Sequence, residues 1–208
     1  NGYDEADFRI PFSGKKNSQF TIIYTGSFYD AHQPDILWKA LKELIEHGKI
    51  KPDKITVEIY GKNTSSFVLG NYVNDAAINK IVHLFGYVDH TNSIKLLGKA
   101  DTLLLFSNSG ETQRAIVTAK VFEYMRSGKP ILAIIDPSGA AAEILKPGKT
   151  GFIADSSSLN SVKETILNIY HLWEENKLQT EPNWNYIQQF ERKTLTAKLA
   201  EVFSSLEQ

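Results

Sequence analysis

The sequence predicts an α/β domain in which a doubly wound, Rossmann-like parallel sheet carries helices on both faces. Three observations support this. Short apolar runs rich in β-branched residues recur along the chain, most of them end at a glycine or a small polar turn, and most are followed by a stretch with helical periodicity. Regular alternation of strands and helices is typical of parallel sheets that are covered by helices.

The predicted strands are residues 20–25, 55–60, 81–85, 102–106, 131–135 and 151–154. Helices are predicted from Pro34 up to Gly48, around 94–97, over 117–126 and over 140–145. Proline is favoured in the first turn of a helix, which places a helix start at Pro34. Glycine is favoured just after the last turn, so we expect Gly148 to cap the helix over 140–145.

Beyond Asp155 the pattern becomes wholly helical. One helix aligns Val162, Ile166, Ile169 and Trp173, and a final helix aligns Leu195, Leu199, Val202 and Leu206, with Phe203 beside them. We therefore predict one domain over 20–208, with a covering helical tail over 157–208. Residues 1–19 are expected to be a linker from a missing N-terminal domain, since the chain starts at Asn1 and its single methionine is Met125.

Composition excludes several classes of function. The 208 residues include 23 Lys plus Arg against 24 Asp plus Glu, so no basic excess favours nucleic acid as a partner. The absence of cysteine removes thiolate catalysis and cysteine metal sites and fits a reducing compartment. The five histidines show no ligand spacing, so no metal is expected, and no apolar run approaches the roughly 20 residues that span a bilayer.

Two familiar nucleotide-binding motifs are absent from the sequence. Gly148-Lys149-Thr150 resembles the end of a P-loop, but the glycine required five positions earlier is Glu143. Only Gly26 follows the first strand, so the Gly-x-Gly-x-x-Gly fingerprint of dinucleotide enzymes is absent. Asn63-Thr64-Ser65 is a formal glycosylation sequon that we interpret as a turn.

Candidate chemistry gathers after the fourth predicted strand. Ligands of open parallel sheets bind outside the carboxyl ends of the strands. Here a polar loop over 107–114 leads into a helix, and the N–H groups over 117–119 with Arg114 and Lys120 would suit a diphosphate. The alternative is a solvated Arg114 and a weak i, i+3 pair between Lys120 and Glu123. Glu123 lies one turn further on, and a carboxylate can hold the vicinal diol of a ribose.

Residues 120–130, Lys-Val-Phe-Glu-Tyr-Met-Arg-Ser-Gly-Lys-Pro, closely resemble the signature helix of retaining, GT-B-fold glycosyltransferases of the family-4 type. In that family the glutamate at the position of Glu123 holds the nucleotide ribose. Similarity extends over essentially the whole chain, including residues 1–4, 24–27, 86–88, 100–101, 136–143 and 148–152.

The resemblance implies the nucleotide-sugar donor domain of a transferase whose acceptor-binding N-terminal domain is missing. Expected partners are a nucleoside diphosphate sugar, used as substrate with no separate cofactor, and a glycan or lipid-linked acceptor, as in polysaccharide biosynthesis. Expected location is the cytoplasm, with peripheral membrane association through the missing half as an option. Arg114 and Lys120 are the expected catalytic cations. The expected nucleotide-sugar-binding residues are Gly26, Ser27, Gly86, Tyr87, Val88, Thr118, Ala119 and Glu123.

The chain departs from the family at three positions. Ala115 replaces a glutamate that commonly contacts the donor sugar, and Ser27 and His32 stand where an arginine and a lysine usually clamp the diphosphate. Arg114 and Lys120 are hypothesised to compensate. A degenerate, non-catalytic nucleotide-binding or interaction module and a nucleotide-sugar epimerase remain alternatives.

Three residues each have two possible roles. Tyr87 could contact the base or pack, Ser138 could cap a helix or approach the donor together with Gly139, and His32 could contact phosphate or be an exposed loop residue.

Overall fold

The structure, a computed structural model, describes residues 1–9, 12, 16–28, 34–62, 68–107 and 110–206, with the side chains of 111 and 112 left out. Its strands are β1 (Phe20–Thr25), β2 (Ile55–Tyr60), β3 (Val82–Phe85), β4 (Thr102–Phe106), β5 (Ile131–Ile135) and β6 (Gly151–Asp155). They form one parallel sheet in the order β3-β2-β1-β4-β5-β6. This arrangement confirms the predicted fold class.

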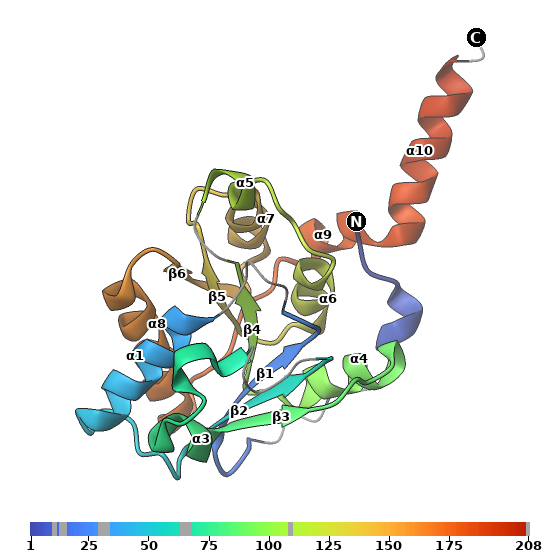
Figure 1. Cartoon of the computed structure of the whole chain (residues 1–208). Helices are drawn as coiled ribbons and strands as arrows, with labels where there is room; N and C mark the ends of the chain where they lie inside the picture. The colour runs from blue at the N-terminus through green and yellow to red at the C-terminus, as the bar shows by residue number, and fades with distance from the viewer. Residues whose placement is uncertain (10–11, 13–15, 29–33, 63–67, 108–109, 207–208) are drawn as a thin grey trace.

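The helices are α1 (Asp35–Glu46), α3 (Ala76–Ile81), α4 (His90–Lys99), α5 (Glu111–Arg114), α6 (Lys120–Ser127), α7 (Ala140–Gly148), α8 (Leu159–Glu174), α9 (Trp184–Ile187) and α10 (Arg192–Leu206). Short 3-10 turns are η1 (Glu5–Phe8), η2 (Gly70–Tyr72) and η3 (Gln188–Phe190). Figure 1 shows α1, α3 and α8 on one side of the sheet and α4, α6 and α7 on the other.

Each face of the sheet has its own core, because neighbouring strand residues point to opposite faces. Ile22 belongs to the cluster with Trp38 of α1 and Ile166 of α8. Ile23, the next residue, belongs to the cluster with Leu97 of α4 and Met125 of α6. Burying both faces makes the strands near-continuous apolar runs, which is why they could be located from the sequence.

The N-terminal segment, predicted as a linker, packs on the domain. Tyr3 is 1% exposed, its N–H donates to Phe190 O at 3.1 Å, and its carbonyl accepts from Arg192 N at 2.8 Å. Phe8 joins the same apolar cluster. Anything that precedes Asn1 would therefore leave the domain close to the start of α10, as Figure 1 also shows.

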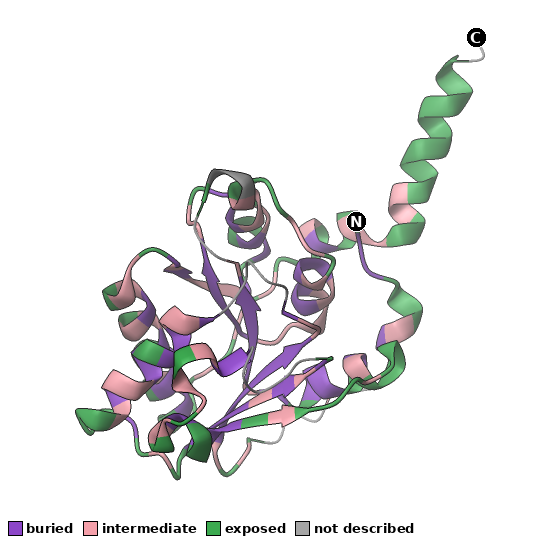
Figure 2. Cartoon of the chain, in the orientation of Figure 1, coloured by how far each residue is buried: buried purple, intermediate pink, exposed green. Residues whose placement is uncertain are grey.

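The predicted covering tail is only half correct. Helix α8 packs on α1 and β6, whereas α10 extends away from the domain with its apolar residues exposed (Figure 2). Exposed fractions are 54% for Leu199 and Val202, 59% for Phe203 and 76% for Leu206. Periodicity establishes an apolar stripe on a helix but does not establish what covers it, which is why this part of the prediction was wrong.

Two helix ends also differ from the sequence prediction. Helix α6 begins at Lys120, with Ala119 as N-cap, rather than at Val117. In α7, Gly148 is the last helical residue and Lys149, at φ 56°, is the left-handed cap. Gly148 packs closely instead, because a β-carbon there would lie 2.7 Å from Met125 Sδ and the methionine side chain would have to shift.

Candidate functional site

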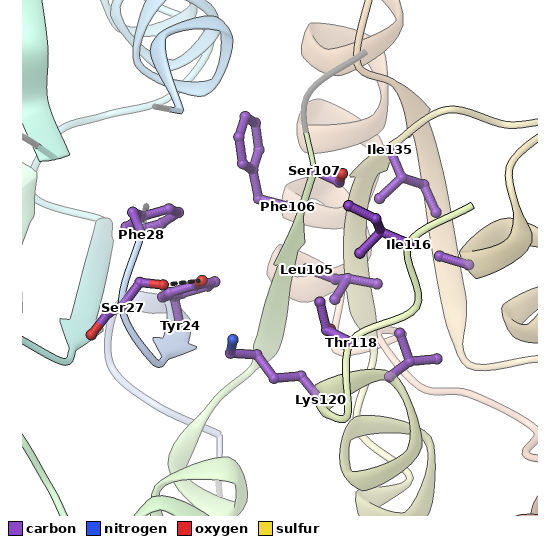
Figure 3. A pocket seen from close by; sticks show the side chains of 12 residues that line it. Tyr24, Ser27, Phe28, Leu105, Phe106, Ser107, Ile116, Thr118, Lys120 and Ile135 are labelled. Carbon is purple, nitrogen blue, oxygen red and sulfur yellow. Dashed lines mark hydrogen bonds between the residues drawn. The ribbon is translucent and has the colours of Figure 1, made fainter. Parts of the chain in front are cut away.

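The sheet order places a topological switch point between β1 and β4. These strands are neighbours, but the chain continues from β1 toward one edge of the sheet and from β4 toward the other. Loops that diverge in this way leave a crevice at the carboxyl ends of the strands, where ligands bind in this architecture. A cavity of about 90 Å³ lies there, between Ser27 after β1, Ser107 after β4 and Lys120 at the start of α6 (Figure 3).

Gly26 and Lys120 approach each other closely at this point. Gly26 has φ +127°, and a β-carbon on it would lie 2.5 Å from Lys120 Cε and 2.7 Å from Lys120 Nζ. Glycine is therefore favoured here by its backbone conformation, and a β-carbon would also force the end of the Lys120 side chain to move. The same ammonium lies 5.1 Å from the centre of the Tyr24 ring.

Lys120 is a cation held in an unfavourable setting. Burial lowers the pKa of its ammonium group, and the charge of Glu123 offsets this only in part. Among the described residues no carboxylate lies within 4.0 Å of Lys120, so the weak pair with Glu123 is not formed. A poorly solvated cation that lines a cavity and has no carboxylate within 4.0 Å among the described residues favours binding of an anion there.

Glu123 lies on the same helix, one turn after Lys120. Burial raises the pKa of its carboxyl group, with a smaller opposing effect from His90, whose ring pairs with Asp7 at 3.0 Å. No hydrogen bond to the Glu123 carboxylate is found within the described part of the chain. Its oxygens are therefore available to accept hydrogen bonds from a ligand hydroxyl.

A buried hydrogen bond fixes α6 against the end of β1. The Tyr124 hydroxyl accepts from Thr25 N at 3.2 Å and lies 3.2 Å from Thr25 Oγ1. Tyr124 is fully buried, and this burial raises the pKa of its hydroxyl to about 12. Because Tyr124 sits between the helix and the strand, it positions Lys120 and Glu123 relative to Gly26.

Arg114 lies outside the cavity. Its Nε atom pairs with Asp136 Oδ2 at 3.1 Å and its Nη2 atom donates to Ser138 Oγ at 2.6 Å. Ser138 also bonds to Asp136, which holds the pKa of that carboxyl below its usual range. Arg114 does not line the cavity, and the N-cap of α7 is Gly139 rather than Ser138.

A sequence model of the family glycosyl transferases group 1 matches residues 6–183. The chain belongs to this family. No significant match is found among curated protein sequences.

Solved glycosyltransferases share the fold of this group 1 chain. S. aureus TarM, solved with fondaparinux, alpha-GlcNAc-glycerol and UDP, gives a TM-score of 0.64 at 14% identity over 93% of this chain. The pneumococcal O-GlcNAc transferase GtfA, solved with UDP and GlcNAc, gives 0.65 at 16% identity over 93%. A glycosyltransferase from Rickettsia africae gives 0.67 at 19% identity over 92%. The chain spans 37%, 37% and 49% of these proteins.

The loop after β3 carries Gly86, Tyr87 and Val88 at the same edge of the sheet. Tyr87 is 69% exposed, and Lys62 Nζ lies 5.2 Å from its ring centre. Tyr87 is thus a surface side chain and not a packing residue. Phe85, just before it, is 44% exposed and stacks on Tyr60 with ring centres 4.5 Å apart. This stacked pair was not predicted from the sequence.

Of the other residues predicted for the site, some line the cavity and some do not. Ser27 and Thr118 line the cavity, whereas Ala119 is the exposed N-cap of α6. Ala115 is exposed after α5 and does not line the cavity. His32 lies outside the described residues. The structure thus brings Gly26, Ser27, Thr118 and Lys120 together, with Glu123 on the same helix.

Sequence reasoning missed the apolar walls of the cavity. Tyr24 and Phe28 stack with ring centres 4.2 Å apart, and Phe106 meets Phe28 edge to face. Tyr24 and Phe106 lie within strands and Phe28 follows one, so in the sequence all three resemble ordinary core residues. The available signal was their position at the ends of β1 and β4. Ser107 Oγ and Thr118 Oγ1, also from cavity residues, are buried with no hydrogen-bond partner among the described residues.

The described residues contain no group of three or more His, Cys, Asp or Glu side chains that could hold a metal ion. None of their helices has the length and apolar character needed to cross a bilayer.

Proposed function

We propose that this chain is the donor-binding half of a retaining glycosyltransferase that moves a sugar from a nucleoside diphosphate to a glycan or lipid-linked acceptor. One observation carries the proposal: the partly desolvated Lys120 ammonium lies over the bare backbone of Gly26 at the switch point, with the Glu123 carboxylate one turn away. A cation followed by an acceptor on one helix suits a diphosphate and the ribose attached to it.

Lys120 has the main electrostatic role in this proposal. When the glycosidic bond breaks, negative charge develops on the leaving diphosphate, and a fixed cation in a poorly solvated site stabilises it strongly. Backbone N–H groups at the start of α6 add to this effect. Arg114 would join only if its pair with Asp136 opened, so we assign it a secondary part.

Nucleoside recognition completes the donor site. We assign the ribose hydroxyls to Glu123 and the base to the loop over Gly86, Tyr87 and Val88, where an exposed aromatic face is available for stacking. No further cofactor is part of the scheme, since the nucleotide sugar is itself the substrate.

The acceptor half is proposed to precede Asn1. Tyr3 bonds to Arg192 at the base of α10, so a preceding domain would emerge beside the exposed stripe of Leu199, Val202 and Phe203. Covering this stripe would remove apolar surface from water. The location proposed for the whole protein is the cytoplasm, at the membrane surface where its acceptor is lipid-linked.

Calorimetric titration tests the proposal. We expect the purified 208-residue chain to bind one of UDP, GDP, ADP or CMP saturably, and Glu123→Ala to weaken that binding at least about tenfold. Glu164→Ala, on the exposed side of α8, is the control and should bind as the parent does. Absence of binding by any of these nucleotides at millimolar concentration would contradict a working donor site and favour a degenerate module.

Turnover separates the two enzyme alternatives. A transferase whose cleft closes between two domains should show no turnover as the isolated chain. The longer protein should release nucleoside diphosphate only when an acceptor is present. Conversion of a nucleotide sugar to its epimer without an acceptor would contradict transfer and favour the epimerase.

A further inference from the structure

The cavity at the switch point is lined mainly by apolar side chains, although polar residues lie around it. Its walls are formed mainly by apolar side chains, among them Tyr24, Phe28, Phe106, Ile116, Ile135 and Ala141. Lys120 is the only charged residue that lines it, and no carboxylate or carboxamide does so among the described residues. In Figure 3 the Lys120 side chain extends toward Tyr24 and Ser27, while Leu105, Ile116 and Ile135 lie on the opposite side.

These walls suit a substituent that is apolar over most of its surface. Hydroxyls of a bare sugar ring would find polar partners only at Lys120 and at the few hydroxyl side chains of the wall, and a hydroxyl turned toward the aliphatic side chains would be buried without a partner, which is unfavourable. The volume of about 90 Å³ is several times the roughly 10–15 Å³ that one water molecule needs. The cavity is therefore large enough for a substituent of several heavy atoms beside the position assigned to the diphosphate.

We infer that the donor carries an N-acylated amino sugar, an acetamido sugar in the simplest case, and that its acyl group occupies this cavity. This inference rests on the proposed function. The methyl group would pack against Ile116 and Ile135. The amide N–H and C=O would give partners to the hydroxyls of Ser107 and Thr118, which have none among the described residues. A 6-deoxy sugar also offers a methyl group, but it would leave both hydroxyls without partners.

Paired donors test the inference. The nucleotide that binds tightest among UDP, GDP and ADP is used to carry each sugar, and the conjugates are compared by calorimetry with the 208-residue chain. N-acetylglucosamine is compared with glucose, N-acetylgalactosamine with galactose, and 6-deoxyglucose with glucose. We expect the acetamido sugar to bind about fourfold more tightly than its hydroxyl counterpart in at least one pair, as burial of one methyl group predicts.

Two variants link this preference to the cavity. Ala141→Leu fills the cavity and Ile116→Asn makes its wall polar, so we expect each to reduce the preference to about onefold. Ala197→Leu and Leu199→Asn make the same changes on the exposed face of α10 and should keep the preference of the parent.

Other results of these titrations would overturn the inference, and they differ in what they leave standing. Equal binding of the two sugars with intact nucleotide binding would overturn this inference and leave the proposed function standing. Preference for 6-deoxyglucose alone would overturn the acyl assignment. A preference that survives Ala141→Leu and Ile116→Asn would show that another surface reads the acyl group. Absence of all nucleotide binding would overturn the proposed function and this inference with it.

Discussion

The Nζ atom of Lys120 lies 2.7 Å from the position that a β-carbon on Gly26 would take. We expect Gly26→Ala to displace the ammonium group and weaken nucleoside diphosphate binding at least about tenfold, measured by calorimetry. Backbone strain at φ +127° alone would lower stability by about 1–3 kcal/mol. Gly48→Ala separates the two effects, since Gly48 also has positive φ but no neighbour near its β-carbon. Equal losses of affinity in both variants would contradict the contact.

Arg114 and Lys120 should contribute unequally to binding. Arg114 is half exposed and paired with Asp136, and a surface pair of this kind contributes only about 0–1 kcal/mol to stability. We expect Arg114→Ala to change nucleotide affinity less than about threefold and Lys120→Ala to reduce it at least about tenfold. A double variant much weaker than the two single effects combined would indicate that Arg114 moves into the site when donor binds.

Nucleotide affinity should fall both at alkaline pH and at acidic pH. Burial lowers the pKa of Lys120 from 10.5, so affinity should fall on the alkaline side before 10.5 is reached, as the ammonium loses its proton. Burial raises the pKa of Glu123 from 4.5, so affinity should fall on acidification before pH 4.5 is reached, as the carboxylate gains one. Titrations across pH in matched ionic strength measure both limbs. An unchanged alkaline limb in Lys120→Met would contradict the assignment.

The same two shifts predict the opposite effect on stability. Between the lowered pKa of Lys120 and 10.5 the unfolded chain binds more protons than the folded chain, so stability should rise with pH in that window. Above 4.5 and up to the raised pKa of Glu123, stability should instead rise as pH falls. At neutral pH, Lys120→Met should therefore raise the free energy of unfolding, by about 0.5–2 kcal/mol, while weakening binding. Lys198→Met, on α10, is the control in urea denaturation.

Tyr124 should act on stability and on the site together. Tyr124→Phe leaves the Thr25 N–H buried without its partner, which costs about 1–3 kcal/mol. We expect that loss in urea denaturation, with a smaller loss of nucleotide affinity as α6 becomes less firmly placed. Tyr186→Phe removes a hydroxyl with no hydrogen bond among the described residues and should change neither quantity by much. Equal stability of the two variants would show that the bond to Thr25 contributes little.

The stripe on α10 should affect association and not folding. Leu199, Val202 and Phe203 are all more than half exposed, so replacing them with serine should change the free energy of unfolding by less than about 0.5 kcal/mol per site. If the stripe is a docking surface for the preceding domain, the same triple variant should destabilise the longer protein. A large loss of stability in the isolated chain would mean that α10 packs on the domain in solution.

Much of the fold could be predicted because both faces of the sheet are buried. Strands such as Phe20–Thr25 and Ile131–Ile135 are continuous apolar runs, and their limits agree with the sequence prediction. The ends of helices were predicted less accurately than the limits of these strands. The sequence fits a helix from Val117 onward, but the α-helix begins only at Lys120, with Ala119 as its N-cap.

The sequence by itself determined the six strands, the longer helices between and after them, the glycine turn after β1 and the helix that carries Lys120 and Glu123, because periodicity and turn chemistry are local properties. Only the tertiary structure decided where the charges lie. It placed the Lys120 ammonium over Gly26, 94 positions apart in the chain, and paired Arg114 with Asp136 away from the cavity. It also left the apolar stripe of α10 uncovered. Such contacts depend on how separate elements pack, and residue spacing along the chain does not specify that packing.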